Sequence, residues 1–294
     1  MLSRRLFIRN TSLITACVMI KPGLFTEYNK KYIGLQLYTV RDAMQKDPSG
    51  TFAKVAQIGY NSVEGATYTG TRQFYGMDSK AFSALLKENN LIMPSSHYRL
   101  GEEKEKGGEV QGTLLHGWDQ AVDDAATVGV KYMVCAYLSA SERGDLNHFK
   151  YIANQLNIAG ERCKKAGIQL CYHNHDFEFV QQDGQLPYDV LLNETDENLV
   201  KMEMDIYWVT KAGQDPITLI KKFPGRYPLW HLKDMNPTDK SFAEVGYGSI
   251  DFKKIFKYAN KAGLAYFFVE QDTTPGLPMD SITKSITYIK KSLI

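Results

Sequence analysis

The sequence has no apolar run of about 20 residues, the length that a helix needs to cross a bilayer. Cysteine is also scarce, with four residues in 294 and no C-x-x-C spacing. Cys17 falls in the N-terminal segment, and the remaining three, Cys135, Cys163 and Cys171, are an odd number that does not describe a disulfide framework. We therefore expect these three to be buried free thiols on strands and a helix.

Two phosphate-binding signatures are missing as well. No G-x-G-x-x-G follows the first predicted strand, and no G-x-x-x-x-G-K-[ST] occurs in the chain, so dinucleotides and nucleoside triphosphates lack their usual cradles. The chain has no basic block, because 35 Lys and Arg against 33 Asp and Glu leave a net charge of +2. We therefore expect no nucleic-acid partner.

The N-terminal segment has the composition of an export signal. A basic stretch at residues 3–9 precedes a short apolar stretch at residues 11–20, which is the order of a secretory signal. Its paired arginines and Phe7 resemble a twin-arginine signal, and residues 14–17 resemble a lipoprotein cleavage box; a disordered basic start is the alternative. We expect residues 1–27 to be signal and linker, and the mature protein to be periplasmic or lipid-anchored.

After this segment, apolar strands alternate with helical stretches, and no break in composition separates them. Such alternation indicates parallel β-α-β packing, and eight units favour a closed barrel. We predict an α/β fold, a single (β/α)8 barrel over residues 31–294, with a mobile loop at residues 101–108 and Asp145 as a helix cap. The predicted strands cover residues 33–39, 62–64, 91–96, 132–135, 167–170, 201–205, 227–231 and 266–270, and the predicted helices cover residues 50–58, 79–89, 112–128, 145–166, 188–192, 216–222, 252–262 and 279–291.

Polar residues gather where these strands end, which is where barrel enzymes place their active sites. Asp205, His231 and Glu270 end three consecutive strands, and His173 ends the strand before them. Nitrogen and oxygen donors together suit one divalent ion such as Mn, Zn, Co or Mg, so we predict these four as metal ligands. Structural alternatives are that Asp205 caps a turn, that His231 is a satisfied core histidine, and that Glu270 pairs with Lys233.

His175 lies two residues beyond His173, and we expect only one of the two to reach the barrel axis. We assign His173, which is nearer the buried strand, although a bulge would let both contribute. The alternative for His175 is a hydrogen-bonding role in the loop. Glu178 lies further out, where a surface role and a functional role are equally compatible with the sequence.

Further polar residues at strand ends are candidates for proton transfer. Lys233 is placed to stabilise an oxyanion, or alternatively to pair with Asp234. Glu64 and His97 end the second and third strands and are candidate proton carriers, or partners of a metal ligand.

Three residues are candidates for contacting the substrate. Tyr38 and Trp208 would stack on a sugar face, although such rings are also ordinary packing. Arg41 follows the first strand and either binds substrate or pairs with Asp42.

Several segments resemble the sugar phosphate isomerase/epimerase group of xylose isomerase-like barrels, a group that also contains a branch of apurinic endonucleases. They are residues 34–42 (GLQLYTVRD), 172–179 (YHNHDFEF), 205–208 (DIYW), 212–216 (AGQDP) and 231–234 (HLKD). The resemblance covers residues 32–294. It implies a metal bound by Glu, Asp, His and Glu from strands five to eight, where Asp205, His231 and Glu270 match the last three and His173 replaces the first Glu.

The resemblance also implies metal-assisted chemistry beside the carbonyl of a keto sugar, through an enediolate. Glu270 would carry the proton, with His175, His97 or Glu64 as the second acid or base. The principal expectation is isomerisation or epimerisation of an unphosphorylated sugar. The alternatives are a lyase or dehydratase that eliminates from 3-keto-glycosides or keto-polyols, and an exported sugar-binding barrel without catalysis. The expected partner is a small sugar or glycoside, and the sequence is compatible with a homo-oligomer.

Overall fold

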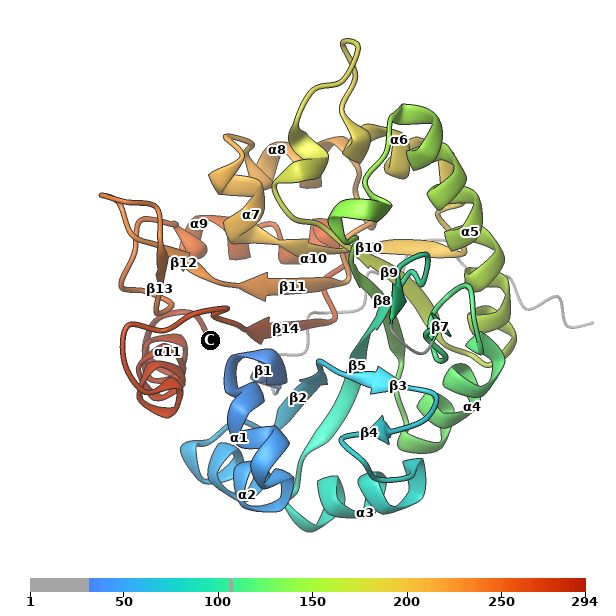
Figure 1. The fold of residues 1–294 in the computed structure, drawn as a ribbon. Coiled ribbons are helices and arrows are strands. Elements are labelled where there is room, and N and C mark those ends of the chain that lie inside the picture. Colours follow the sequence, from blue (N-terminus) through green and yellow to red (C-terminus); the bar gives the residue numbers. More distant parts are fainter. Residues whose placement is uncertain (1–31, 106–107) are drawn as a thin grey trace, which may run out of the picture.

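The computed structural model describes residues 32–105 and 108–294 and shows a closed barrel of parallel strands surrounded by helices (Figure 1). The predicted (β/α)8 fold is thereby confirmed, while the predicted export signal lies outside the described residues. The strands follow one another around the barrel in sequence order, and β1 pairs with β14 to close it. The barrel strands are β1 (Gly34–Gln36), β2 (Ser62–Gly65), β5 (Ile92–Arg99), β8 (Tyr132–Tyr137), β9 (Gln169–His173), β10 (Val200–Asp205), β11 (Leu229–Leu232) and β14 (Tyr266–Val269).

The helices pack their apolar faces against the outer face of the barrel strands, and this layer between helices and strands forms most of the hydrophobic core. Asp145 caps the longest of them, accepting a hydrogen bond from His148 N at 2.9 Å as predicted. No helix among the described residues is long and apolar enough to cross a membrane. The helices are α1 (Arg41–Lys46), α2 (Pro48–Ile58), α3 (Ser79–Glu88), α4 (Trp118–Val128), α5 (Leu146–Lys165), α6 (Pro187–Glu194), α7 (Ile206–Lys211), α8 (Pro216–Lys222), α9 (Phe252–Phe256), α10 (Ala259–Ala262) and α11 (Pro278–Ser292), with short 3-10 turns η1 (Leu37–Val40), η2 (Ala140–Glu142) and η3 (Phe177–Phe179).

Short antiparallel hairpins lie outside the barrel sheet. They pair β3 (Tyr68–Thr69) with β4 (Gln73–Phe74), β6 (Lys104–Glu105) with β7 (Gly108–Glu109), and β12 (Asp234–Met235) with β13 (Phe242–Ala243). The second of these places a short hairpin in the segment predicted as a mobile loop, residues 101–108.

Inside the barrel, an apolar floor supports a polar layer. Cys171, Leu229 and Phe268 belong to one small buried cluster, and each precedes by two residues a predicted site residue that lies on the same strand or directly after it. Because side chains two residues apart share a face of a strand, the polar layer stands directly above this floor. Gly34 of β1 makes room for the floor, since a Cβ there would collide with the ring of Phe268.

Several strands differ in their bounds from the prediction, and the differences in β1 and β5 affect the site. β1 stops at Gln36, because the Gln36 side chain accepts a hydrogen bond from Tyr38 N at 3.1 Å and starts the turn η1. β5 continues to Arg99, two residues past His97. His97 therefore lies below the rim of the barrel.

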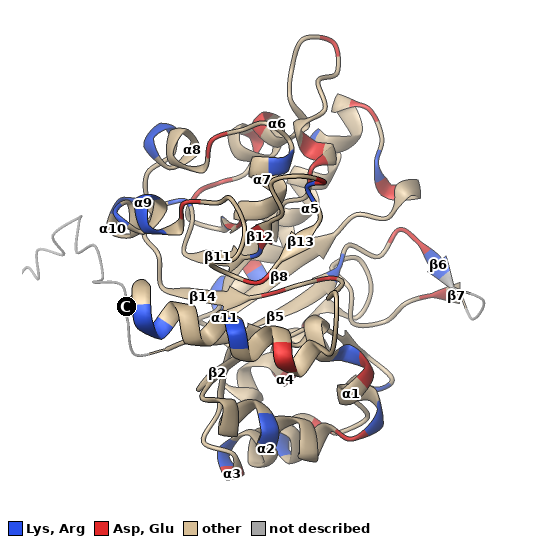
Figure 2. Cartoon of the chain, turned by 90° about the vertical axis from the view of Figure 1, so that its left-hand side faces the viewer, with Lys and Arg blue, Asp and Glu red and all other residues tan. Residues whose placement is uncertain are grey.

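The remaining composition-based expectations concern thiols and charges. Cys135, Cys163 and Cys171 are free and buried on β8, α5 and β9, as predicted. Figure 2 shows basic and acidic positions interspersed along the outer helices. Charged residues are ordinarily exposed, as on these helices, so the buried ionisable residues at the strand ends are unusual.

Candidate active site

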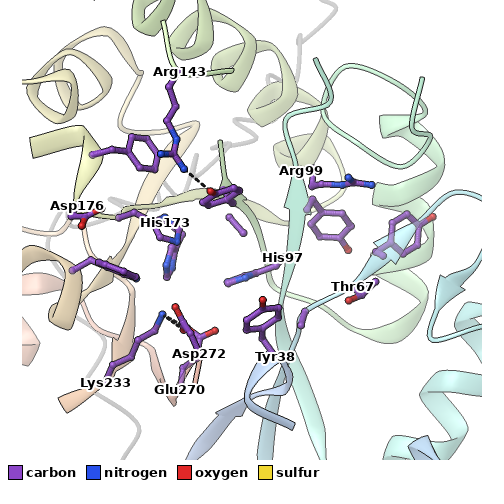
Figure 3. Close-up of a pocket in the computed structure, with 18 of the residues that line it drawn as sticks. Tyr38, Thr67, His97, Arg99, Arg143, His173, Asp176, Lys233, Glu270 and Asp272 are labelled. Atoms are coloured by element: carbon purple, nitrogen blue, oxygen red, sulfur yellow. Dashed lines mark hydrogen bonds and ion pairs between the residues drawn. The ribbon is translucent and has the colours of Figure 1, made fainter. Parts of the chain in front are cut away.

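A cavity of about 690 Å³ opens at the carboxyl ends of the barrel strands. In Figure 3, ionisable side chains gather at one end of it around Lys233 and Glu270, while Thr67 and Arg99 lie on the far side of His97. The cavity thus extends well beyond the ionisable cluster.

The four predicted metal ligands converge at the ionisable end. His173, Asp205, His231 and Glu270 end or directly follow four neighbouring strands, and one donor atom of each lies within 4.8 Å of the others. His173 Nε2 is 3.5 Å from Asp205 Oδ2, and His231 Nδ1 is 2.6 Å from Glu270 Oε2. All four side chains are buried, so their charges and lone pairs must be compensated within the cluster.

The sequence left open whether Asp205 caps a turn or faces a metal site, and the structure shows an oxygen in each position. Its Oδ1 accepts a hydrogen bond from Trp208 N at 3.0 Å and caps α7. Its Oδ2 faces the cluster, 2.9 Å from Lys233 Nζ, but without the angles of a hydrogen bond from any described residue. Burial raises the pKa of Asp205 to about 6, against the attraction of Lys233 and His231. One oxygen is therefore structural and the other is available to a ligand.

Lys233 points into the cluster rather than toward Asp234. Its Nζ lies 2.7 Å from Glu270 Oε2, 2.8 Å from Asp272 Oδ1 and 2.9 Å from Asp205 Oδ2, so the predicted pairing of Glu270 with Lys233 is present. Burial acts to lower the pKa of Lys233, but the three carboxylates outweigh it and hold this pKa well above 10.5. The same contact, together with His231, holds the pKa of Glu270 well below 4.5 although burial opposes it.

Glu64 and His97, the other predicted proton carriers, lie one layer deeper. Glu64 is fully buried, and its Oε2 is 2.5 Å from His231 Nε2 and accepts from Gln36 Nε2 at 2.8 Å. The His97 ring lines the cavity, but its Nε2 is 2.8 Å from Glu203 Oε2 and its Nδ1 is 3.3 Å from Gln36 Nε2. Both ring nitrogens therefore face protein groups, which agrees with the alternative that these residues support a metal ligand.

Glu203 is the residue of this cluster that the sequence prediction missed. It lies inside β10, two residues before Asp205 and in register with His173, and it is fully buried. Its Oε2 is 2.8 Å from His97 Nε2 and 2.9 Å from His173 Nδ1. The signal was a carboxylate two residues from another carboxylate on one buried strand, since this spacing places both on the inner face.

The expectation that only one of His173 and His175 reaches the barrel axis is wrong. Both line the cavity, and their ring centroids are 4.9 Å apart. β9 ends at His173, and His175 follows on the same side. Burial, with Lys233 adding to it, lowers the pKa of His175 well below 6.5, and its Nδ1 is buried without a hydrogen-bond partner among the described residues. His175 therefore brings a neutral imidazole to the cavity.

Aromatic rings form the cavity walls. Tyr38 and Trp208, both predicted to contact a sugar, line it together with Tyr137 and Phe177. The guanidinium of Arg143 lies 3.9 Å above the Phe177 ring and 5.0 Å from the Tyr137 ring. Sequence patterns did not reveal these last three residues, because they lie at or beyond the strand ends, where no periodicity marks them.

The structure also places Arg41 and Glu178. Arg41 Nη1 donates to the backbone oxygens of Tyr38 at 2.9 Å and Asp272 at 3.0 Å, so it fastens two segments of the cavity rim instead of pairing with Asp42. A surface role for Glu178 is excluded, because it is fully buried and accepts hydrogen bonds from Tyr172 Oη at 2.8 Å and from the backbone N–H of His175 at 2.9 Å.

The donor chemistry of the four predicted ligands fits a divalent cation. Burial lowers the pKa of His173 well below 6.5, so the ring is neutral. Because its Nδ1 faces Glu203, the proton lies there and the Nε2 lone pair faces Asp205 Oδ2. A lone pair opposite a carboxylate oxygen without a hydrogen bond is the arrangement that a shared cation satisfies.

Three comparisons relate the sequence and fold of this chain to known proteins. The family model described as Xylose isomerase-like TIM barrel matches residues 52–292. An inosose dehydratase of Clostridium botulinum (strain Alaska E43 / Type E3) is 32% identical over 256 residues, which are 74% of this chain and 82% of that protein. A sugar phosphate isomerase/epimerase structure from Parabacteroides distasonis ATCC 8503 has a TM-score of 0.76 at 27% identity, covering 89% of this chain and 94% of that one.

A second similar structure bears on the fold alone. The IOLI protein, whose structure is described as having a binding zinc atom, is 14% identical with a TM-score of 0.67, and the match covers 88% of this chain and 97% of that one. The barrel topology and the matched family model agree over nearly all of the described residues. The chain therefore belongs to the xylose isomerase-like TIM barrel family.

Proposed function

We propose that this sugar-processing enzyme is a metal-dependent lyase, which eliminates a β-oxygen from a 3-keto-glycoside or keto-polyol. Isomerisation of a keto sugar is the alternative reaction of the same site. His173, Asp205, His231 and Glu270 would hold the ion, and two imidazole nitrogens favour Zn, Co or Mn over Mg. When bound, such an ion polarises a carbonyl oxygen and acidifies the neighbouring C–H.

One observation carries the lyase assignment: the same cavity is lined by an imidazole whose Nδ1 has no hydrogen-bond partner among the described residues, His175, and by an ammonium, Lys233. His175 has its pKa lowered well below 6.5, and Lys233 has its pKa raised well above 10.5. Groups whose environments drive their pKa values apart are suited to acid and base roles at one pH. His175 would take the proton from the carbon next to the carbonyl, and the Lys233 ammonium would stabilise the negative charge that develops on oxygen.

Elimination accounts for this pair better than isomerisation does. As the C–H proton moves to His175, a C=C bond forms and the β C–O bond breaks. The departing oxygen takes up a proton from the Lys233 ammonium, and exchange with water then returns both residues to their starting protonation states. Epimerases that resemble this chain exchange protons through two glutamates, of which only Glu270 has a counterpart here. The relatives named inosose dehydratase also support elimination.

The size and walls of the cavity favour a glycoside over a single ring. A volume of about 690 Å³ lies in the upper half of the range of about 300–1,000 Å³ for small-molecule sites. Tyr38, Tyr137 and Trp208 line it, and aromatic rings of this kind pack on the apolar faces of sugars. They would hold the part of the substrate that does not react.

The test is incubation of the Zn²⁺-loaded protein with a 3-keto-glycoside and with an inosose in D₂O, followed by ¹H NMR. We expect release of the aglycone, or of water, with formation of the unsaturated ketone. Proton exchange without elimination would instead establish the isomerase alternative, and saturable binding without exchange would establish a binding protein.

A pair of histidine variants tests the assigned base. His175→Gln removes it, and we expect turnover to fall by about 10²–10⁴-fold. His148→Gln makes the same change on α5, where His148 pairs with Glu102 at 3.0 Å, and should leave turnover unchanged. Equal rates for the two variants would rule out His175 as the base.

A further inference from the structure

A second layer of polar side chains lies directly beneath the four predicted metal ligands. Gln36, Glu64 and Glu203 are fully buried, and only the edge of His97 reaches the cavity. Because these groups are shielded from solvent, each N–H and each charge has to be compensated by a neighbour. Their hydrogen bonds therefore assign the proton positions on the rings above them.

The side-chain amide of Gln36 determines which atoms of this network donate hydrogen bonds and which accept them. Its Oε1 accepts from Tyr38 N at 3.1 Å, so its Nε2 donates toward Glu64 Oε2 at 2.8 Å and points to His97 Nδ1 at 3.3 Å. His97 Nε2 lies 2.8 Å from Glu203 Oε2 and 3.2 Å from Glu64 Oε2. Because the Gln36 amide N–H faces Nδ1 and two carboxylates face Nε2, the His97 ring carries its proton on Nε2.

The two histidines among the metal ligands each face both layers. His173 directs Nδ1 to Glu203 Oε2 at 2.9 Å and Nε2 toward Asp205 Oδ2 at 3.5 Å. His231 directs Nε2 to Glu64 Oε2 at 2.5 Å and to Glu203 Oε2 at 3.3 Å, and Nδ1 to Glu270 at 2.6 Å. In both rings, one nitrogen faces a carboxylate of the lower layer and the other faces a carboxylate among the four predicted metal ligands.

We propose that Glu203 is a positioning residue, which together with Glu64 fixes the orientation and tautomer of His173 and His231 for metal binding. A ring nitrogen that binds a metal carries no proton, so the opposite nitrogen must carry one and needs an acceptor. Below His173 the floor is apolar, with Cys171, Leu229 and Phe268. The carboxylate of Glu203 is the acceptor that the fold provides there.

A competing arrangement uses the same residues differently. His97, His173, Glu203 and His231 also have donor atoms within 4.8 Å of one another, so an ion could lie in the lower layer. That arrangement would use Nδ1 of His173 and Nε2 of His231 as ligands and would leave the protons on the nitrogens that face Asp205 and Glu270. The two arrangements therefore predict opposite tautomers for both rings.

Histidine ¹⁵N NMR on the full chain loaded with Zn²⁺ alone separates them, and with six histidines the spectrum is small enough to assign. We expect His173 to bind through Nε2 and carry its proton on Nδ1, and His231 to bind through Nδ1 and carry its proton on Nε2. The reverse pattern would overturn the proposal and place the ion in the lower layer.

Two variants test the role of the carboxylate without relying on turnover. Glu203→Gln keeps an acceptor but loses the charge, and we expect Zn²⁺ affinity, measured by chelator competition, to fall about 10–100-fold. Glu178→Gln makes the same change at another fully buried carboxyl, which contacts Tyr172 and the backbone of His175 instead of a predicted ligand ring. It should keep the wild-type affinity within a few-fold.

The outcomes remain interpretable if a variant folds poorly. Unfolding of each variant without metal reports its structural cost, and the wild-type NMR pattern needs no variant. Unchanged affinity in Glu203→Gln, or equal losses in both variants, would overturn the proposal. The positioning role of Glu203 rests on the proposed function only in requiring a bound metal. Absence of Zn²⁺ binding by the wild type would refute the positioning role and the metal-dependent function together. Zn²⁺ binding without elimination would refute only the lyase reaction.

Discussion

Lys233 is a buried cation whose removal should weaken the metal-free protein and increase its dependence on metal. The residue is 1% exposed, and its Nζ lies 2.7–2.9 Å from Glu270, Asp272 and Asp205. Lys233→Met keeps the length of the side chain and removes the charge, which leaves three carboxylates without their shared partner. Removing one partner of a buried pair costs about 3–5 kcal/mol, so we expect the unfolding free energy of the metal-free variant to fall by that amount.

A divalent ion should recover part of this loss. An ion at 100 times its Kd stabilises the native state by about 2.7 kcal/mol, and in the variant it also relieves the carboxylates that Lys233 no longer neutralises. We therefore expect Zn²⁺ to raise the midpoint of thermal unfolding more in Lys233→Met than in the wild type. At about 2–4 °C per kcal/mol, the metal-free variant should unfold roughly 10 °C below the wild type.

The assay is thermal and urea unfolding after chelation and after Zn²⁺ addition, followed by circular dichroism. Lys284→Met is the matched control, because Lys284 pairs with Glu244 at 3.0 Å but has a 55% exposed side chain, and exposed pairs contribute little. A metal-free Lys233→Met protein as stable as the wild type would refute the reasoning. So would a Zn²⁺ response equal in the two proteins.

Three further predictions concern groups around the site. Burial raises the pKa of Glu178 from 4.5 to about 8, so the folded state keeps this proton while the unfolded chain loses it; stability should fall as pH rises from about 4.5 to 8. Glu178→Gln cannot ionise, and in urea titrations it should gain on the wild type by up to a few kcal/mol at pH 8 and by little at pH 5. Trp208→Ala removes a cavity wall and should raise KM for a glycoside about 3–10-fold, whereas an unchanged KM would remove Trp208 from the binding surface. Burial raises the pKa of the Cys163 thiol to about 12 and those of Cys135 and Cys171 further, so a thiol reagent should label these three residues only on unfolding, and labelling of the native protein would contradict their burial.

The sequence predicted the fold because each barrel unit carries its own signal. Apolar strands alternate with amphipathic helices, and the short connections leave a parallel barrel as the arrangement that buries both. Convergence of His173, Asp205, His231 and Glu270 followed from this topology alone, because the carboxyl ends of parallel strands meet at one face. The structure brings these four residues together within 4.8 Å.

Depth within the barrel is what the sequence could not provide. Strand ends are not level, since β5 runs two residues past His97 and β1 stops at Gln36. As a result, His97 and Glu64 direct their polar atoms into a lower layer although each was predicted at a strand mouth. Glu203 was overlooked for the same reason. It lies inside a strand, and it belongs to the site because the register between β9 and β10 places it beside His173.

The departure from the family pattern at His173 has a consequence for the proton chemistry. Nδ1 of His173 faces Glu203 at 2.9 Å, and its Nε2, 3.5 Å from Asp205, would bind the proposed ion, so with the ion bound this ring would have no free nitrogen to exchange a proton with a substrate. A glutamate ligand, in contrast, keeps a second oxygen that can do so. The negative charge that such a glutamate would bring is retained behind the ring, on Glu203, where it would strengthen the imidazole as the proposed metal ligand. In the proposed reaction, proton transfer would fall to His175 and Lys233, which both line the cavity, and their opposite pKa shifts suit a reaction in which one group accepts a proton while the other stabilises a departing oxygen.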